Sequence, residues 1–279
     1  MLRIAVPNKG TLSETAVQML HEAGYATRRD SKELIVTDAR NDVEFFYLRP
    51  RDIATYVGSG ALDIGVTGRD LLLDSHSPAL EVEALDFGGS TFRFAGPAGR
   101  FSSLDDLNGV RVATSYDTLV GDFLERNGVT AELVRLDGAV ESAVRLGVAD
   151  AVADVVSTGT TLRNQGLEIF GPVILESTGV LIAAREGIAG FETFQRRLQG
   201  VMVARRYVLI DYDLPAELLE KATAVTPGLE SPTVSPLADT GWLAVRAMVP
   251  RKDMNNVMDE LYEIGARAIL VSPIHAARI

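Results

Sequence analysis

Apolar runs alternate with amphipathic segments along the first two hundred residues of the chain. The apolar runs predict strands at residues 2–6, 34–37, 43–48, 64–66, 111–114, 131–136 and 149–156. The amphipathic segments predict helices at residues 11–23, 52–58, 119–127, 137–147 and 191–203. Thr11 and Glu14 fit a capping box, and Gly24 and Gly147 fit positions just past helix ends. This alternation is typical of an α/β fold.

The order of elements changes after residue 206. It becomes strand, helix, strand, strand, helix, strand, at residues 207–212, from 215, 233–237, 242–249, 253–264 and 267–272. This is the ferredoxin-like order, and it predicts a separate small domain over residues 207–279.

Glycine-rich loops divide the remaining residues into two lobes. The loops 88–90 and 96–99 flank a crossing from one lobe to the other, and we expect the chain to return near residues 181–185. The predicted first lobe covers residues 1–90 and 184–206, and the second covers 91–183. Two crossings between two lobes are typical of hinged, periplasmic-binding-protein-like folds.

Two segments resemble each other. Residues 60–71 and 147–162 each run from a glycine through an aspartate and an apolar stretch to Thr-Gly and a leucine. They indicate either a repeat shared by two similar lobes or a chance similarity between α/β turns.

Bulk properties exclude several classes of protein. The net charge of −11 argues against a general nucleic-acid-binding protein. The absence of cysteine excludes disulfides and cysteine-based zinc sites. The apolar runs are too short to predict a membrane span, and the chain opens with a strand rather than a signal region, so we expect a cytoplasmic protein.

Residues 149–162 carry the clearest candidate chemistry. A strand of small apolar residues, of the kind found in parallel sheets covered on both faces, ends in a loop of hydroxyl-bearing residues and glycine at 157–161. Such a loop at the start of a helix binds phosphate through its N–H groups. Asp154 lies within the apolar run, where a carboxylate needs a partner. The loop predicts a ribose-phosphate site, and the alternative is a capped turn that binds nothing.

Three further charged residues lie near predicted strand or helix ends. Lys9 follows the first strand and Arg49 the third, where open α/β sheets bind ligands. Glu141 lies in the segment that leads into the phosphate-type loop. The alternatives are a solvated lysine, a surface ion pair and a solvated glutamate. Neither a Walker loop nor a dinucleotide-binding glycine motif occurs.

Several motifs together resemble the ATP phosphoribosyltransferase family. They are residues 7–10 (Pro-Asn-Lys-Gly), 48–54, 65–71, 141–162 and 226–233. They span almost the whole chain, and the C-terminal domain resembles the regulatory (ACT-like) module of the long form. The resemblance implies transfer of a phosphoribosyl group from 5-phosphoribosyl 1-pyrophosphate (PRPP) to N1 of ATP. It also implies Mg²⁺, carried mainly by PRPP and pyrophosphate, with its protein ligands unknown.

The resemblance also implies roles for individual residues. The PRPP site comprises Asp154, Ser157, Thr158, Gly159, Thr160 and Thr161. The ATP side comprises Lys9, Arg49, Asp70, Leu71 and Ser90. Lys9, Arg49, Glu141 and Asp154 are the implied catalytic residues. An inhibitory L-histidine site comprises Asp213, Leu229, Ser231, Thr233 and Ala268.

Other functions remain open at this stage. By resemblance the protein is a homo-oligomer, from dimer to hexamer, with small-molecule partners and neither nucleic acid nor membrane. Leu229 and Ala268 could instead be core residues, and Thr233 an ordinary strand residue. A hinged solute-binding protein without turnover, or a phosphoribosyltransferase for another base, are the alternatives to the implied activity.

Overall fold

The computed structural model describes residues 1–30, 32–156, 159–239 and 241–278. Two compact units make up the chain. The first comprises Met1–Gln18 and Tyr25–Ala189, and the second comprises Met19–Gly24 and Gly190–Ile279. No helix in the described residues combines the length and apolar character needed to span a membrane.

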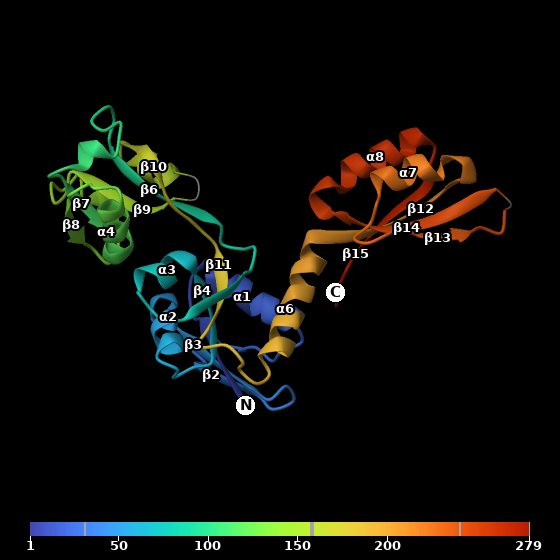
Figure 1. The fold of residues 1–279 in the computed structure, drawn as a ribbon, viewed down its shortest axis with the longest axis horizontal. Coiled ribbons are helices and arrows are strands. Elements are labelled where there is room, and N and C mark those ends of the chain that lie inside the picture. Colours follow the sequence, from blue (N-terminus) through green and yellow to red (C-terminus); the bar gives the residue numbers. More distant parts are fainter. Residues whose placement is uncertain (31, 157–158, 240, 279) are drawn as a thin grey trace. The chain divides into compact units, whose positions relative to one another are not determined.

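A six-stranded sheet forms the first lobe of the first unit (Figure 1). In spatial order its strands are β2 (Ile35–Asp38), β3 (Val43–Leu48), β1 (Leu2–Pro7), β4 (Ile64–Gly68), β11 (Gly179–Ala183) and β5 (Leu80–Ala84). The helices of this lobe are α2 (Pro50–Gly58), α3 (Arg69–Asp74) and most of α1 (Thr11–Glu22). Buried side chains of α2 pack in one core with those of β1 and β11. Gly24, just past α1, has the left-handed backbone that the sequence predicted.

A five-stranded sheet forms the second lobe. In spatial order its strands are β10 (Leu167–Ser177), β6 (Ser90–Pro97), β9 (Ala151–Val156), β7 (Arg111–Thr114) and β8 (Glu132–Arg135). Its helical segments are α4 (Asp117–Arg126), α5 (Thr160–Asn164), and the 3-10 turns η1 (Asp105–Leu107) and η2 (Val140–Ser142). Ala151 and Ala153 belong to one core and Val152 to another, so β9 is covered on both faces as predicted. It is parallel to β7 but antiparallel to β6.

The two lobes share one pairing scheme. In each lobe two parallel pairs join three strands (β3, β1, β4 and β8, β7, β9), and two antiparallel strands follow. The two aspartates of the sequence echo make the same contacts. The Arg3 N–H donates to Asp63 Oδ2 at 2.8 Å, and the Arg111 N–H donates to Asp150 Oδ2 at 3.3 Å. These matched contacts favour a structural repeat over chance similarity.

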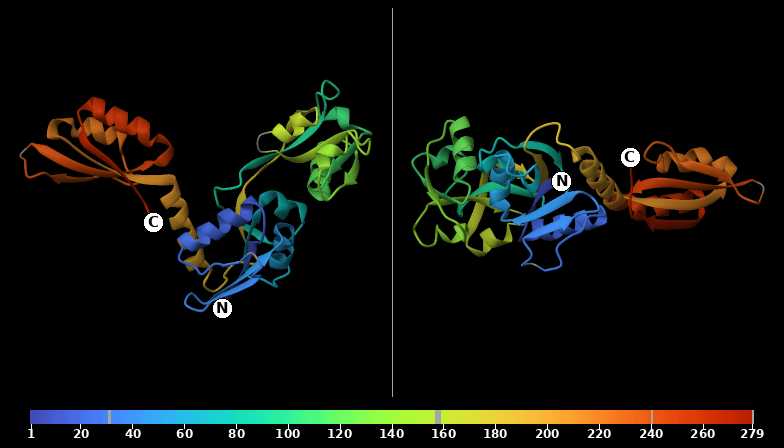
Figure 2. Two further views of the ribbon diagram at one scale, coloured as in Figure 1. Left: turned by 180° about the vertical axis from the view of Figure 1, so that it is seen from behind. Right: turned by 90° about the horizontal axis from the view of Figure 1, so that it is seen from below.

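The chain crosses between the lobes twice, between β5 and β6 and between β10 and β11 (Figure 2). The return comes at residues 177–179, earlier than the boundary of 184 that the sequence predicted. The reason is that β11 belongs to the first sheet, where it pairs antiparallel with both β4 and the edge strand β5. Helix α6 (Phe191–Arg206), predicted as part of the first lobe, belongs to the second unit.

The predicted helix over residues 137–147 does not form. Ala139 has left-handed backbone (φ 50°), and the chain tightens into η2. The N–H of Val148 then returns to the carbonyl of Ala143, which closes the segment as a turn. Gly147 is left-handed, as a residue past a helical turn should be.

The second unit contains a four-stranded antiparallel sheet of ferredoxin-like order. In spatial order its strands are β13 (Thr233–Pro236), β14 (Trp242–Pro250), β12 (Tyr207–Pro215) and β15 (Arg267–Pro273). The helices α7 (Leu219–Val225) and α8 (Met254–Ile264) cover one face of this sheet (Figure 1). Each is preceded by a 3-10 turn, η3 (Ala216–Leu218) or η4 (Arg251–Asp253). Alternate residues of β12 enter the core with Ala222 and Leu261 of the helices.

Candidate functional site

A cleft of about 1010 Å³ is lined by residues of both lobes of the first unit. Six predicted site residues line it, namely Lys9, Arg49, Asp70, Leu71, Ser90 and Asp154. Most of them lie at or just beyond the carboxyl ends of β1, β3, β4 and β9. Parallel strands of an open sheet end at the same edge, which is where α/β proteins bind ligands.

Asp70 is held firmly at the start of α3. Its side chain is buried, and its Oδ1 accepts a 2.7 Å hydrogen bond from the Ser177 hydroxyl. The Asp70 N–H donates to the same Ser177 oxygen at 3.1 Å. A Cβ on Gly68 would collide with the Asp70 carboxylate, so this close approach requires glycine.

Asp154 has an altered acidity. Burial raises its pKa to about 6, and the charges of Glu141 and Asp70 act in the same direction, while the hydrogen bond from the Val155 N–H opposes them. Glu141 does not line the cleft, but it lies close enough to Asp154 to influence this titration. Asp154 is therefore an acid poised to change charge near neutral pH.

Lys9 and Arg49 bring positive charge to the first-lobe side of the cleft. Both side chains are exposed, and within the described residues neither forms an ion pair with an acid. Exposed cations at strand ends can meet an incoming phosphate without first breaking a salt bridge. Leu71 is buried at the start of α3, where it adds apolar surface.

The predicted phosphate loop is described only in part. Ser157 and Thr158 lie outside the described residues. Gly159 is buried and left-handed (φ 69°) directly before α5, and Thr160 and Thr161 are exposed in the first turn of that helix. None of these three lines the cleft, although the strand that leads to them carries Asp154.

Sequence reasoning missed several cleft residues. Arg51, Ser115 and Tyr116 line the cleft, as does Ser177. Burial and the charge of the neighbouring Asp70 carboxylate raise the pKa of Tyr116. The sequence feature that could have indicated Tyr116 is its place two residues after the predicted strand 111–114, and Arg51 lies two residues beyond Arg49. Neither position indicates on its own that two lobes meet there.

The predicted histidine-site residues lie on β12, β13, β15 and a loop. Asp213 is half-buried on β12, opposite Ala244 of β14. Leu229, Ser231, Thr233 and Ala268 are exposed. The two apolar members therefore do not belong to the core of this unit. Ala268 has left-handed backbone (φ 50°) where the pairing of β15 with β12 is irregular.

Residues 49–200 match the family model described as ATP phosphoribosyltransferase, and residues 204–276 match "HisG, C-terminal domain". A protein of that name from Pseudarthrobacter chlorophenolicus is 63% identical over the full length of both chains. Its namesake from Streptomyces coelicolor is 61% identical, again over both full lengths. The chain belongs to the ATP phosphoribosyltransferase family. This confirms the resemblance found in the sequence.

Solved structures agree with this family and fold. The ATP phosphoribosyl transferase (HisG:HisZ) complex from Thermotoga maritima matches 72% of this chain and 98% of that chain, with 29% identity and a TM-score of 0.64. A GluR0 ligand-binding core complexed with L-glutamate matches 73% of this chain and 93% of that chain, at 15% identity and a TM-score of 0.50, which shows the fold alone. The predicted two-lobe core with a ferredoxin-like C-terminal domain is confirmed. As a member of the ATP phosphoribosyltransferase family, the protein is a pentosyltransferase of histidine biosynthesis.

Proposed function

We propose that the enzyme transfers the 5-phosphoribosyl group of PRPP to N1 of the adenine of ATP. The products are N1-(5-phosphoribosyl)-ATP and pyrophosphate. The single observation that carries this proposal is the cleft to which the first lobe contributes Lys9, Arg49 and Asp70 and the second contributes Asp154. Two anionic substrates and a developing sugar cation need this combination of cations and acids around one cavity.

We assign PRPP to the second lobe. Asp154, with Glu141 beside it, would hold the ribose hydroxyls, and residues 157–161 would bind the 5-phosphate. The position of α5 directly after this loop supports the assignment, because the N-terminus of a helix favours a negatively charged group.

We assign ATP to the first lobe. Lys9 and Arg49 would bind its phosphates, because both are exposed and have no acid partner within the described residues. Asp70 and Leu71 of the first lobe line the same cleft and would position the nucleoside, together with Ser90 at the start of β6, where the chain enters the second lobe. The division into lobes then brings the two substrates together across the cleft.

The reaction requires no general base to generate its nucleophile. The lone pair of adenine N1 forms the new bond to the anomeric carbon, and the bond from that carbon to pyrophosphate breaks and leaves its electrons on oxygen. Positive charge develops on the ribose, where ionised Asp154 would stabilise it. With a pKa of about 6, Asp154 is mostly ionised at neutral pH. Lys9 and Arg49 contribute the positive potential that suits phosphate groups.

We propose that Mg²⁺ enters with PRPP. Among the described residues, no group of three or more histidines, cysteines, aspartates or glutamates could hold a metal ion. The carboxylates of Asp154 and Glu141 are oxygen donors of the kind that Mg²⁺ accepts, as single ligands beside phosphate oxygens. When bound, the ion neutralises charge on the leaving pyrophosphate.

Mass spectrometry of the product made from ATP and PRPP tests the reaction. We expect a species with the mass of ATP plus one phosphoribosyl group, together with one pyrophosphate for each product molecule. Saturable binding of either substrate without product would indicate a hinged binding protein. Transfer of the ribose to another base, offered in competition with ATP, would indicate a different phosphoribosyltransferase.

We further propose that L-histidine inhibits the enzyme through residues 207–279. Asp213 would meet the ammonium group, with Leu229, Ser231, Thr233 and Ala268 completing the pocket. Exposure of the last four supports a ligand or subunit contact, since their side chains are not needed for the core. An inhibitor acting at a distance must bind one conformation or assembly better than another.

The edges of the ferredoxin-like sheet support self-association. β13 is an edge strand with every residue exposed, and β15 is the other edge. Exposed edges are templates for pairing with another chain. We therefore propose that the protein is a homo-oligomer, from dimer to hexamer. We also propose that it is located in the cytoplasm and has neither nucleic-acid nor membrane partners. Light scattering of the purified enzyme, with and without histidine, measures its mass.

A further inference from the structure

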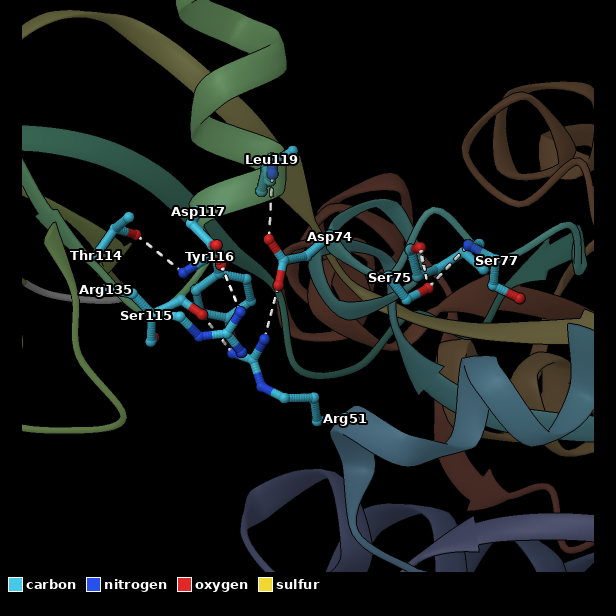
Figure 3. Close-up of polar contacts among 11 residues, drawn as sticks. Arg51, Asp74, Ser75, Ser77, Thr114, Ser115, Tyr116, Asp117, Leu119 and Arg135 are labelled. Carbon is cyan, nitrogen blue, oxygen red and sulfur yellow. Dashed lines mark hydrogen bonds and ion pairs between the residues drawn. The ribbon is translucent and has the colours of Figure 1, made fainter. Parts of the chain in front are cut away.

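Asp74 of the first lobe caps a helix of the second lobe. It is the last residue of α3, where its negative charge is unfavourable because the C-terminal end of a helix dipole is also negative. Its buried Oδ1 accepts a 3.1 Å hydrogen bond from the Leu119 N–H, in the first turn of α4 (Figure 3). Tyr116, the residue before α4, makes no side-chain cap. Asp74 thus supplies from the other lobe the acceptor that a helix start requires.

Arg51 strengthens the same junction. Its Nη1 donates to Asp74 Oδ2 at 2.6 Å, and its Nη2 donates to the Ser115 carbonyl of the second lobe at 2.7 Å. The guanidinium also lies over the Tyr116 ring, 4.8 Å from its centre (Figure 3). A buried carboxylate is therefore satisfied jointly by a cation of its own lobe and an N–H of the opposite lobe.

The junction continues into the cleft. Tyr116, which packs under Arg51, lines the cleft together with Asp70. Asp74 itself does not line the cleft, whereas Arg51, Ser115 and Tyr116 do. A substitution at Asp74 therefore affects the cleft indirectly, by changing the positions of Arg51 and of the start of α4.

We infer that Asp74, acting with Arg51, is a positioning residue that sets the separation of the two lobes and hence the distance between the two bound substrates. The lobes are connected by the segments between β5 and β6 and between β10 and β11, so further contacts between the lobes are needed to hold one separation. Under the proposed function, one substrate lies on each lobe. A small error in lobe separation then slows bond formation more than it weakens the binding of either substrate.

The absence of cysteine from the chain makes the separation measurable. Ala39→Cys in the first lobe and Glu132→Cys in the second are exposed positions for two spin labels. Pulsed electron-spin resonance then gives the distance distribution between the lobes in the full-length protein. Asp74→Ala removes both contacts, whereas Asp74→Asn keeps an acceptor for the Leu119 N–H and removes only the charge. Asp122→Asn is the control, because Asp122 of α4 forms an exposed pair with His76, which lies just past α3.

We expect a broader lobe-to-lobe distribution for Asp74→Ala, an intermediate one for Asp74→Asn and an unchanged one for Asp122→Asn. We expect kcat to fall by roughly 10- to 100-fold in Asp74→Ala, with changes in either KM below about threefold. The control should keep both constants within about twofold.

Unchanged distributions in both Asp74 variants would overturn the inference, as would broadened distributions with wild-type kcat. Loss of thermal stability with an unchanged distribution would assign Asp74 a purely structural role. The kinetic measurement rests on the proposed function, but the distance measurement does not, so an error in the reaction assignment would leave the separation result standing. If Asp74→Ala does not fold, the Asp74→Asn variant decides.

Discussion

Replacing Asp154 by asparagine should make the protein more stable and much less active. Burial raises the pKa of this carboxyl from 3.8 to about 6. At about 1.4 kcal/mol for each pKa unit, the ionised group costs the folded state about 3 kcal/mol above pH 7. Asparagine keeps an oxygen for the Val155 N–H but carries no charge, so this cost disappears.

Proton binding at Asp154 decides whether stability rises or falls with pH. Between pH 3.8 and 6 the folded protein binds more protons at Asp154 than the unfolded chain does, so this group lowers the stability of the wild type as the pH rises through that window. At pH 7.5 the melting temperature of Asp154→Asn should exceed that of the wild type by about 6 to 12 °C. At pH 4 the two values should converge. Differential scanning calorimetry across this pH range measures the difference between the two melting temperatures.

Activity should change in the opposite direction. Loss of one well-placed charge at the ribose should lower kcat by about 100-fold at pH 7.5. In the wild type, kcat/KM for PRPP should fall below about pH 6 as Asp154 takes up a proton, and the variant should lack this acidic limb.

Asp150→Asn is the matched control. Hydrogen bonds led by that from the Arg111 side chain lower the pKa of Asp150, so removing this charge should destabilise the protein at pH 7.5 and leave the acidic limb in place. If the difference in melting temperature between Asp154→Asn and the wild type did not vary with pH, this prediction would be wrong, because Asp154 would then not titrate as a buried acid. Near-normal activity in folded Asp154→Asn would refute its role at the ribose.

Three further predictions concern other parts of the chain. Lys9→Ala and Arg49→Ala should each raise KM for ATP by about tenfold and change KM for PRPP little, because both cations lie on the first-lobe side of the cleft. Steady-state kinetics with each substrate varied in turn measures both constants, and a larger effect on KM for PRPP would contradict the prediction. Gly68→Ala should lower kcat by about tenfold while the chain stays folded, since the added Cβ at position 68 would displace the Asp70 carboxylate. An unchanged kcat would show that this position tolerates a side chain. Asp213→Ala in the full-length enzyme should raise the histidine concentration needed for half inhibition at least tenfold, with the activity in the absence of histidine unchanged. Equal inhibition of variant and wild type would place the histidine site elsewhere.

Local patterns in the sequence determined much of this protein. Apolar runs and turn residues predicted most of the strands, the ferredoxin-like order after residue 206 and the coverage of β9 on both faces. They also placed Lys9, Arg49 and Asp154 at strand ends, and the structure brings all three to one cleft. This succeeded because the side-chain period of a strand is local, and because β1 and β3, which precede Lys9 and Arg49, are parallel strands that end at a common edge. Asp154 lies on β9 of the second sheet and lines the same cleft from the other lobe.

Only the tertiary structure decided how distant segments meet. The place of β11 inside the first sheet, the turn at residues 137–147 and the joining of Asp74 to Leu119 all depend on partners far away in the sequence or on backbone that folds back on itself. The raised pKa of Asp154 likewise depends on what covers the carboxylate. Periodicity records which face of an element is buried, but not which element buries it. That choice belongs to packing and long-range hydrogen bonding, which no single segment encodes.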